Sequence, residues 1–209
     1  MIDYKEIIKT FTEQDYENER VNLHLHTTYS DGKGDFCDLI KQAKEKGYKK
    51  IAICDHNTLK GYEENGIDDI VIPAVEFDVW CGYVFLHLLA YGVDINNPEL
   101  QSFCAKSKRE TELDIIRIFS TRNIKKLINA IHNAGGIAVL AHPACCWAIS
   151  HDRFVKKLIS YGLDGIEVYY PYKRHRGIIK FTTANNIEKI ADKYGLIKTG
   201  GTDLHGENL

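Results

Sequence analysis

The stretch Leu23-His24-Leu25-His26 places two histidines at alternate positions near the end of a short apolar segment. Such a segment is typical of a β-strand, and side chains two residues apart on a strand point to the same face. We therefore expect both imidazoles on one side of a sheet. Asp31 follows in the next loop, within Ser30-Asp31-Gly32.

Short apolar runs alternate with helical patterns along the chain, which is typical of β-α units around a parallel sheet. The seven strand candidates are residues 21–25, 50–54, 70–75, 84–90, 137–140, 165–169 and 196–199. Most are continuous apolar runs, as expected of strands buried on both faces. The pattern predicts an α/β fold in which seven units form a small barrel, with an open doubly wound sheet as the alternative.

The helical patterns between these runs carry recognisable end signals. Asp35 is a predicted N-cap, and Asn97-Pro98 is a cap followed by proline at the first helical position. Residues 178–194 form the last expected helix, which Gly195 closes. Residues 1–20 are predicted to be an N-terminal arm or helix, and 21–209 a single domain. The connection 91–136 is expected to be a helical excursion between strands four and five.

Composition limits the classes of function. The 209 residues are 44% hydrophobic, with 27 basic and 29 acidic residues and a net charge of −2, so overall charge indicates neither a nucleic-acid nor a membrane surface. The first residues are too polar for a signal peptide, and no apolar run approaches the roughly 20 residues of a membrane span. The six cysteines include no C-x-x-C pair. We expect a cytoplasmic protein with free thiols.

Histidine and acidic side chains recur where the strands end. Because the carboxyl ends of barrel strands meet at one rim, residues from six strands are expected to converge there. The nine candidate metal ligands are His24, His26, Asp31, His56, Glu76, His87, His142, Asp203 and His205. Nitrogen and oxygen donors of this kind suit zinc, manganese and iron. Nine ligands exceed the needs of one ion, so two or three ions that share a carboxylate such as Glu76 fit better.

The motifs that carry these residues resemble the PHP (polymerase and histidinol phosphatase) family. They are His24-Leu25-His26-Thr27, Ser30-Asp31-Gly32, Asp55-His56-Asn57-Thr58, Val75-Glu76, Ala141-His142-Pro143 and Thr202-Asp203-Leu204-His205-Gly206. The resemblance covers about residues 21–206 and is nearest to the small stand-alone metal-dependent phosphoesterases. It implies a distorted (β/α)7 barrel with up to three ions, commonly manganese, zinc or iron.

The resemblance also implies how the ligands are shared. One ion is expected on His24, His26, Glu76 and Asp203. A second is expected on Glu76, His87 and His142. A third is expected on Asp31, His56 and His205. The candidate catalytic residues are Glu76, Asp203 and His175.

The expected activity is hydrolysis of a phosphate monoester by a hydroxide that bridges two metal ions. Lys173, Arg174 and Arg176 follow strand six and are candidate substrate-binding residues. The expected partner is a small phosphorylated substrate, such as a nucleotide or short RNA, without a membrane or a stable nucleic-acid complex. The oligomeric state stays open.

Two departures concern the substrate pocket rather than the metal motifs. The excursion 91–136 is shorter than the helical insertion usual in the stand-alone phosphoesterases, and Ala144-Cys145-Cys146-Trp147 stands where they often carry an arginine. The alternatives are therefore a histidinol phosphatase and, in another class, a non-catalytic metal-binding module. Metal-assisted amide hydrolysis is a third.

Overall fold

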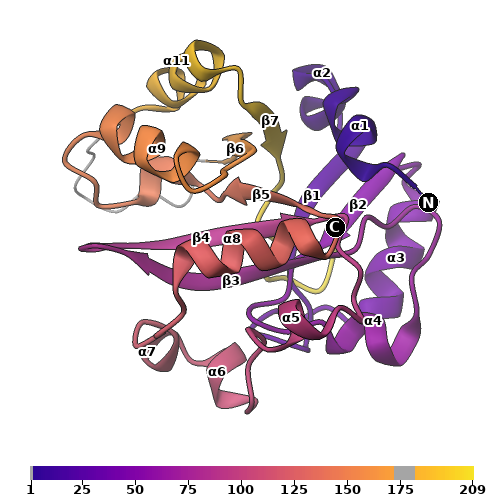
Figure 1. Ribbon diagram of the computed structural model, residues 1–209. Helices are drawn as coiled ribbons and strands as arrows, with labels where there is room; N and C mark the ends of the chain where they lie inside the picture. The colour runs from indigo at the N-terminus through magenta and orange to yellow at the C-terminus, as the bar shows by residue number, and fades with distance from the viewer. Residues whose placement is uncertain (1, 172–181) are drawn as a thin grey trace.

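Two β-sheets with helices packed around them make up the chain (Figure 1). The computed structural model describes residues 2–171 and 182–209. The strands are β1 (Val21–Leu25), β2 (Lys50–Ile53), β3 (Ala74–Cys81), β4 (Val84–Tyr91), β5 (Ile137–Leu140), β6 (Gly165–Tyr169) and β7 (Ile197–Gly200). The helices that come before β3 in the chain are α1 (Tyr4–Lys9), α2 (Glu13–Glu17), α3 (Phe36–Glu45) and α4 (Lys60–Asn65). Those that follow are α5 (Pro98–Gln101), α6 (Arg109–Glu112), α7 (Asp114–Arg117), α8 (Ile124–Asn133), the 3-10 turn η1 (Pro143–Cys145), α9 (His151–Ile159) and α11 (Ala184–Tyr194).

The strands do not close into a ring. β1 and β2 form a parallel pair, and the other five strands form a second sheet in the order β3-β4-β5-β6-β7. Isolated bridges link the two sheets, between Leu25 and Leu204 on one side and between His56 and Glu76 on the other. The expected α/β class is confirmed, but the described residues form no closed barrel. The bridges nevertheless bring the ends of both sheets to one place.

The direction of β4 is the clearest departure from the expected parallel order. β4 pairs antiparallel with both β3 and β5. The pairing of Cys81 with Val84 leaves only Gly82 and Tyr83 as the connection, and Gly82 has a φ of 67°. A two-residue turn can join only antiparallel strands, because a parallel pair needs a long crossover. The third strand was also expected at 70–75, whereas β3 starts at Ala74 and continues into this hairpin.

Capping side chains set the helix starts as the sequence predicts. Asp35 accepts hydrogen bonds from the backbone N–H groups of Cys37 and Asp38 at the start of α3. Asn97 does the same for Leu100 in α5, with Pro98 at the first turn. No helix in residues 2–171 or 182–209 is long and apolar enough to cross a membrane.

The hydrophobic core has two parts, and both contain side chains from the two sheets. The smaller part contains side chains from β1, β2, β4, β5 and α1, including Leu23, Leu89 and Ile8. The expected N-terminal arm is thus two short helices, of which α1 is part of the core. The larger cluster lies beneath the helices, where α8 packs on β3 and β5 and α11 packs on β6 and β7 (Figure 1). These shared buried contacts pack the two sheets against each other.

Candidate metal centre

Nine side chains from both sheets meet where the ends of the sheets come together, and they are the nine that the sequence nominates. These side chains form three overlapping groups. Within each group, the donor atoms all lie within 4.8 Å of one another. The groups are His24, His26, Glu76 and Asp203; His56, Glu76 and His87; and His26, Asp31, His56 and His205. His142 adjoins the second group, because its Nε2 lies 3.2 Å from His87 Nδ1.

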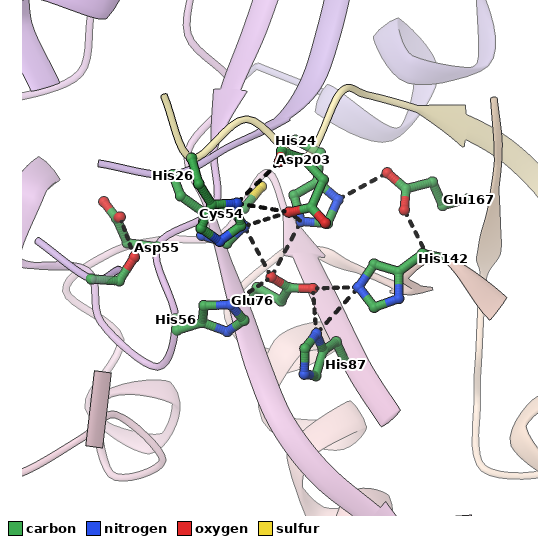
Figure 2. Close-up of polar contacts among 12 residues, drawn as sticks. His24, His26, Cys54, Asp55, His56, Glu76, His87, His142, Glu167 and Asp203 are labelled. Carbon is green, nitrogen blue, oxygen red and sulfur yellow. Dashed lines mark hydrogen bonds and ion pairs between the residues drawn. The ribbon is translucent and has the colours of Figure 1, made fainter. Parts of the chain in front are cut away.

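Glu76 lies at the middle of the cluster (Figure 2). Its Oε2 is 3.2 Å from Nε2 of His24 and 3.2 Å from Nε2 of His26. Its Oε1 is 3.1 Å from His87 Nδ1 and 3.3 Å from His142 Nε2. Each oxygen of one carboxylate thus faces a different set of imidazole nitrogens. Separations of this size suit ligand atoms around a common cation, for which individual metal–ligand bonds are about 2.0–2.2 Å.

Asp31 and Asp203 extend the cluster on either side of His26. Asp203 Oδ1 lies 3.1 Å from His26 Nε2, and Asp31 Oδ1 lies 3.8 Å from His26 Nδ1. The same Asp31 oxygen lies 3.2 Å from His205 Nε2. His26 therefore lies between two carboxylates, one on each ring nitrogen.

The outward nitrogens of several rings are held by acceptors. His24 Nδ1 lies 2.9 Å from Glu167 Oε1, and His205 Nδ1 lies 3.0 Å from the carbonyl of Asp203. Asp78 Oδ1 lies 3.1 Å from His87 Nε2 and 3.5 Å from His56 Nδ1, as ion-pair contacts and not as hydrogen bonds. An acceptor on the outer nitrogen holds the N–H there, so that the inner nitrogen presents its lone pair to the centre. This is the arrangement of histidines that bind metal.

The charges and unpartnered atoms of the cluster fit divalent cations. Both ring nitrogens of His26 are buried without a hydrogen-bond partner. Burial alone raises the pKa of Glu76, but the nearby charges of His24 and His87 help to hold the pKa of Glu76 well below its usual range. Burial lowers the pKa of His56 to about 3, so this ring is neutral at pH 7. Burial also favours the neutral forms of His26 and His87, but nearby carboxylates raise the pKa of each of these rings to about 9. Imidazoles bind metal in the neutral form, so a divalent cation would take the place of these protons.

Two glycines let the loops lie directly against the strand that carries the histidines. A Cβ on Gly32 would overlap the backbone of His26, and a Cβ on Gly201 would overlap His24. This close approach is what places Asp31 and Asp203 beside the imidazoles. Asp203 itself has a φ of 50° and His142 a φ of 25°, which L-residues rarely adopt. Such backbone strain is typical of functional sites.

A cavity of about 680 Å³ opens beside the cluster. It is lined by Asp31, His56, Asp114, Arg117, Cys145, Tyr170, Asp203 and His205 among others. The Tyr170 hydroxyl donates a hydrogen bond of 2.8 Å to Asp203 Oδ2. The cavity gives a small molecule access to the open side of the centre.

The sequence interpretation missed two residues, Asp78 and Arg117. Asp78 is two residues after Glu76 on β3, so it points to the same face, and this spacing was a usable signal. Arg117 had no such signal, because it comes from α7 and meets Asp31, which is 86 positions away.

Two further buried carboxylates support the cluster. Glu167 joins two ligands, because one of its oxygens lies 2.9 Å from His24 Nδ1 and the other accepts a hydrogen bond of 2.8 Å from the backbone N–H of His142. Asp55 accepts hydrogen bonds from Thr27 and Ser30, and so holds the loop that carries Asp31.

The candidates Lys173, Arg174, His175 and Arg176 lie outside the described residues. Their expected roles in substrate binding and proton donation stay predictions. The remaining histidines, His132 and His151, lie apart from the cluster, bonded to Asp164 and to the carbonyl of Pro143.

The chain is similar to known proteins over most of its length. Residues 22–170 match the model of the PHP domain. A phosphoribosyl 1,2-cyclic phosphate 1,2-diphosphodiesterase from Eggerthella lenta is 23% identical, over 89% of this chain and 94% of that protein. A 5'-3' exoribonuclease from Haemophilus influenzae is 27% identical, over 57% of this chain and 46% of that protein.

Two solved structures share the fold. A candidate metal-dependent phosphoesterase from Bifidobacterium adolescentis has a TM-score of 0.66 and 20% identity, covering 90% of this chain and 88% of that one. An amidohydrolase from Chromobacterium violaceum, solved with sulfate and no metal, has a TM-score of 0.70 and 17% identity, with the same coverage of 90% and 88%. With the family model matched over most of its length, the chain belongs to the PHP domain family.

Proposed function

We propose that this protein is a metal-dependent phosphoesterase that hydrolyses a phosphate monoester, such as that of a nucleotide or short oligonucleotide. One observation carries the proposal: the two oxygens of Glu76 face separate sets of imidazole nitrogens, at 3.1–3.4 Å. A carboxylate placed in this way can hold two cations at once. Two neighbouring cations are a recurring arrangement in phosphatases and nucleases.

Three groups of side chains would hold the ions, as the family resemblance implies. The first is His24, His26, Glu76 and Asp203. The second is Glu76, His87 and His142. The third is Asp31, His56 and His205. Manganese, zinc and iron all suit these donors, and we propose two or three ions per chain.

Divalent ions in these positions supply activation of water and neutralisation of the phosphoryl oxygens. The chain's own residues supply the rest. Glu167 orients His24 and fixes the backbone of His142 at the same time. The Tyr170 hydroxyl restrains Asp203, and Asp78 orients His87. These contacts hold the ligands in position before substrate arrives, which lowers the cost of reorganisation during the reaction.

His175, Lys173, Arg174 and Arg176 complete the proposal on the substrate side. They follow Tyr170 and Pro171, and Tyr170 lines the cavity. We propose that the three cations bind a second phosphate or the backbone of the substrate, and that His175 donates a proton to the leaving group.

We also propose that the protein acts in the cytoplasm. All six cysteines are free thiols, which is the form expected in a reducing cytoplasm. A small phosphorylated molecule is the proposed partner, with neither a membrane nor a stable nucleic-acid complex.

The test is a panel of phosphate esters offered to protein that has been stripped with a chelator and reloaded with Mn²⁺, Zn²⁺ or Fe²⁺. The panel contains a nucleoside 3′,5′-bisphosphate, a 5′-phosphorylated short RNA, histidinol phosphate and a 1,2-cyclic phosphate of a sugar. We expect hydrolysis of a monoester only in the reloaded samples. Preference for histidinol phosphate would select that alternative, and failure with every ester would support a non-catalytic metal-binding module.

Hydrolysis of a cyclic phosphodiester is a second candidate. The specific support is the Eggerthella lenta diphosphodiesterase, which matches this chain over nearly the full length of both proteins. In the panel, this candidate predicts consumption of the cyclic ester, with a ring-opened monoester as the first product.

A further inference from the structure

We propose that Arg117 binds the phosphoryl group of the substrate and that its pairing with Asp114 is exchanged for that phosphate. The inference rests on the proposed phosphoesterase function and names the residue that recognises the anion. No motif in the sequence pointed to this arginine.

The position of Arg117 is the first argument. Its Nη1 lies 2.8 Å from Asp31 Oδ2, and its side chain lines the 680 Å³ cavity together with His56, His142 and His205. Among the described residues that line this cavity, Arg117 is the only lysine or arginine. A phosphate dianion that reaches the centre through the cavity therefore meets this guanidinium.

The partners of Arg117 leave part of the guanidinium available. Nη1 donates to Asp31 and to the carbonyl of Thr111, and Nη2 pairs with Asp114. Nε is buried without a hydrogen-bond partner, and the nearest carboxylate oxygen, Asp78 Oδ1, lies 3.8 Å away. In an arginine, Nε and Nη2 form one edge that matches two oxygens of a phosphate. Here that edge carries the pair with Asp114 at Nη2 and the longer contact with Asp78 at Nε, which is not a hydrogen bond.

That pair is weak enough to be exchanged. The Asp114 side chain is 88% exposed and lies three residues before Arg117 on the same short helix. Ion pairs in contact with water are screened and contribute little. A phosphate in the cavity offers the same geometry with a larger negative charge.

The surroundings of α7 show that Arg117 is directed at the centre. Arg117 is only 7% exposed, whereas Ile115 and Phe119 beside it are 73% and 77% exposed. The segment thus turns its apolar side chains to solvent and its arginine inward, toward carboxylates and imidazoles. A guanidinium is costly to bury unless it is paired, and Asp31 and Asp114 supply that pairing here. A phosphate that took the place of Asp114 would keep the buried charge compensated.

The test measures binding of inorganic phosphate to Mn²⁺-loaded protein by calorimetry, with metal content measured in the same samples. We expect Arg117→Gln to weaken phosphate binding roughly 10- to 100-fold, the value of a hydrogen-bonded charged group, while the metal content stays unchanged. The phosphate affinity of Arg117→Lys should lie between those of the wild type and Arg117→Gln. Lysine keeps the positive charge but loses the paired N–H donors of the guanidinium. Asp114→Asn should bind phosphate as tightly as the wild type or more tightly.

Three results would overturn the inference. They are phosphate binding by Arg117→Gln at wild-type affinity, loss of metal from that variant in proportion to its loss of phosphate, and no phosphate binding by the loaded wild type. The second would assign Arg117 to holding Asp31. A wild type that binds phosphate through Arg117 but hydrolyses no ester would contradict the proposed function alone.

Discussion

The half of the centre around Glu76 and the half around Asp31 are built differently. Glu76 and His24 are almost completely buried, at 1% and 0% exposure, whereas the side chains of Asp31 and His205 are 17% and 38% exposed. The buried half lies between the sheets, and the open half lies on two loops beside the cavity. We infer from this comparison that the buried half would serve as a preformed metal cage, and that substrate would arrive on the open half.

The supporting partners differ in the same way. Around Glu76 the supports are carboxylates, Glu167 and Asp78, which hold imidazoles. Around Asp31 the support is a cation, Arg117. Carboxylates strengthen imidazole ligands, while an arginine neutralises charge and can also meet an anion. If the two halves act independently, a substitution in one half should leave the ions of the other half in place.

The largest effect is expected from Glu76→Gln. Because both sets of imidazoles face this carboxylate, the variant should lose ions from the whole cluster. We expect activity to fall by about three orders of magnitude, or ~4 kcal/mol of transition-state stabilisation. Metal analysis and steady-state kinetics check this, with the exposed Glu45→Gln as the matched control. Retention of all ions by Glu76→Gln would refute the central place of this residue.

A smaller and more local effect is expected from His205→Asn. The ring belongs to the open half and touches Asp31 but not Glu76, so one ion at most should be lost. We expect activity to fall by roughly 100-fold, or ~3 kcal/mol of transition-state stabilisation, because one proposed ligand of one ion is removed. His132→Asn is the matched control, because His132 is exposed to a similar degree, 37%, and pairs with Asp164 instead. If His205→Asn lost every ion, the two halves would not be separable.

Glu167→Gln should weaken the support of His24 and His142 without removing a proposed ligand. The amide keeps an oxygen for the N–H of His24 or of His142 but loses the charge. We expect metal affinity to fall by about 10-fold in the buried half. Chelator competition measures this, with Glu188→Gln as the control, since Glu188 pairs with Lys198 on the surface. Equal affinities in Glu167→Gln and wild type would show that the contact does not support the ligands.

These contacts also show what the sequence was able to predict. The apolar runs correctly predicted β1, β2, β5 and β6. The convergence of the nine candidate ligands was also predictable, because these polar residues lie at or near the ends of strands. The reversed direction of β4 was missed, since its turn, Gly82-Tyr83, was not weighed as a hairpin. Arg117 was missed because no local pattern encodes a contact between an excursion and a loop 86 residues away.

The smallest effect is expected from Asp35→Ala. This variant removes the N-cap of α3 and changes none of the proposed metal ligands. Two backbone N–H groups lose their acceptor. The free energy of unfolding should fall by ~1 kcal/mol, with metal content unchanged. Chemical denaturation of the metal-loaded protein measures the change. A loss of bound metal in this variant would mean that α3 and the centre are coupled more tightly than the contacts indicate.

The most direct test of the whole account is the anomalous scattering of crystals of the Mn²⁺-loaded protein, recorded above and below the manganese edge. We predict two peaks that share Glu76, one beside His24, His26 and Asp203 and one beside His87 and His142. Absence of any peak near Glu76 in fully loaded protein, or peaks only at unrelated surface residues, would contradict the account.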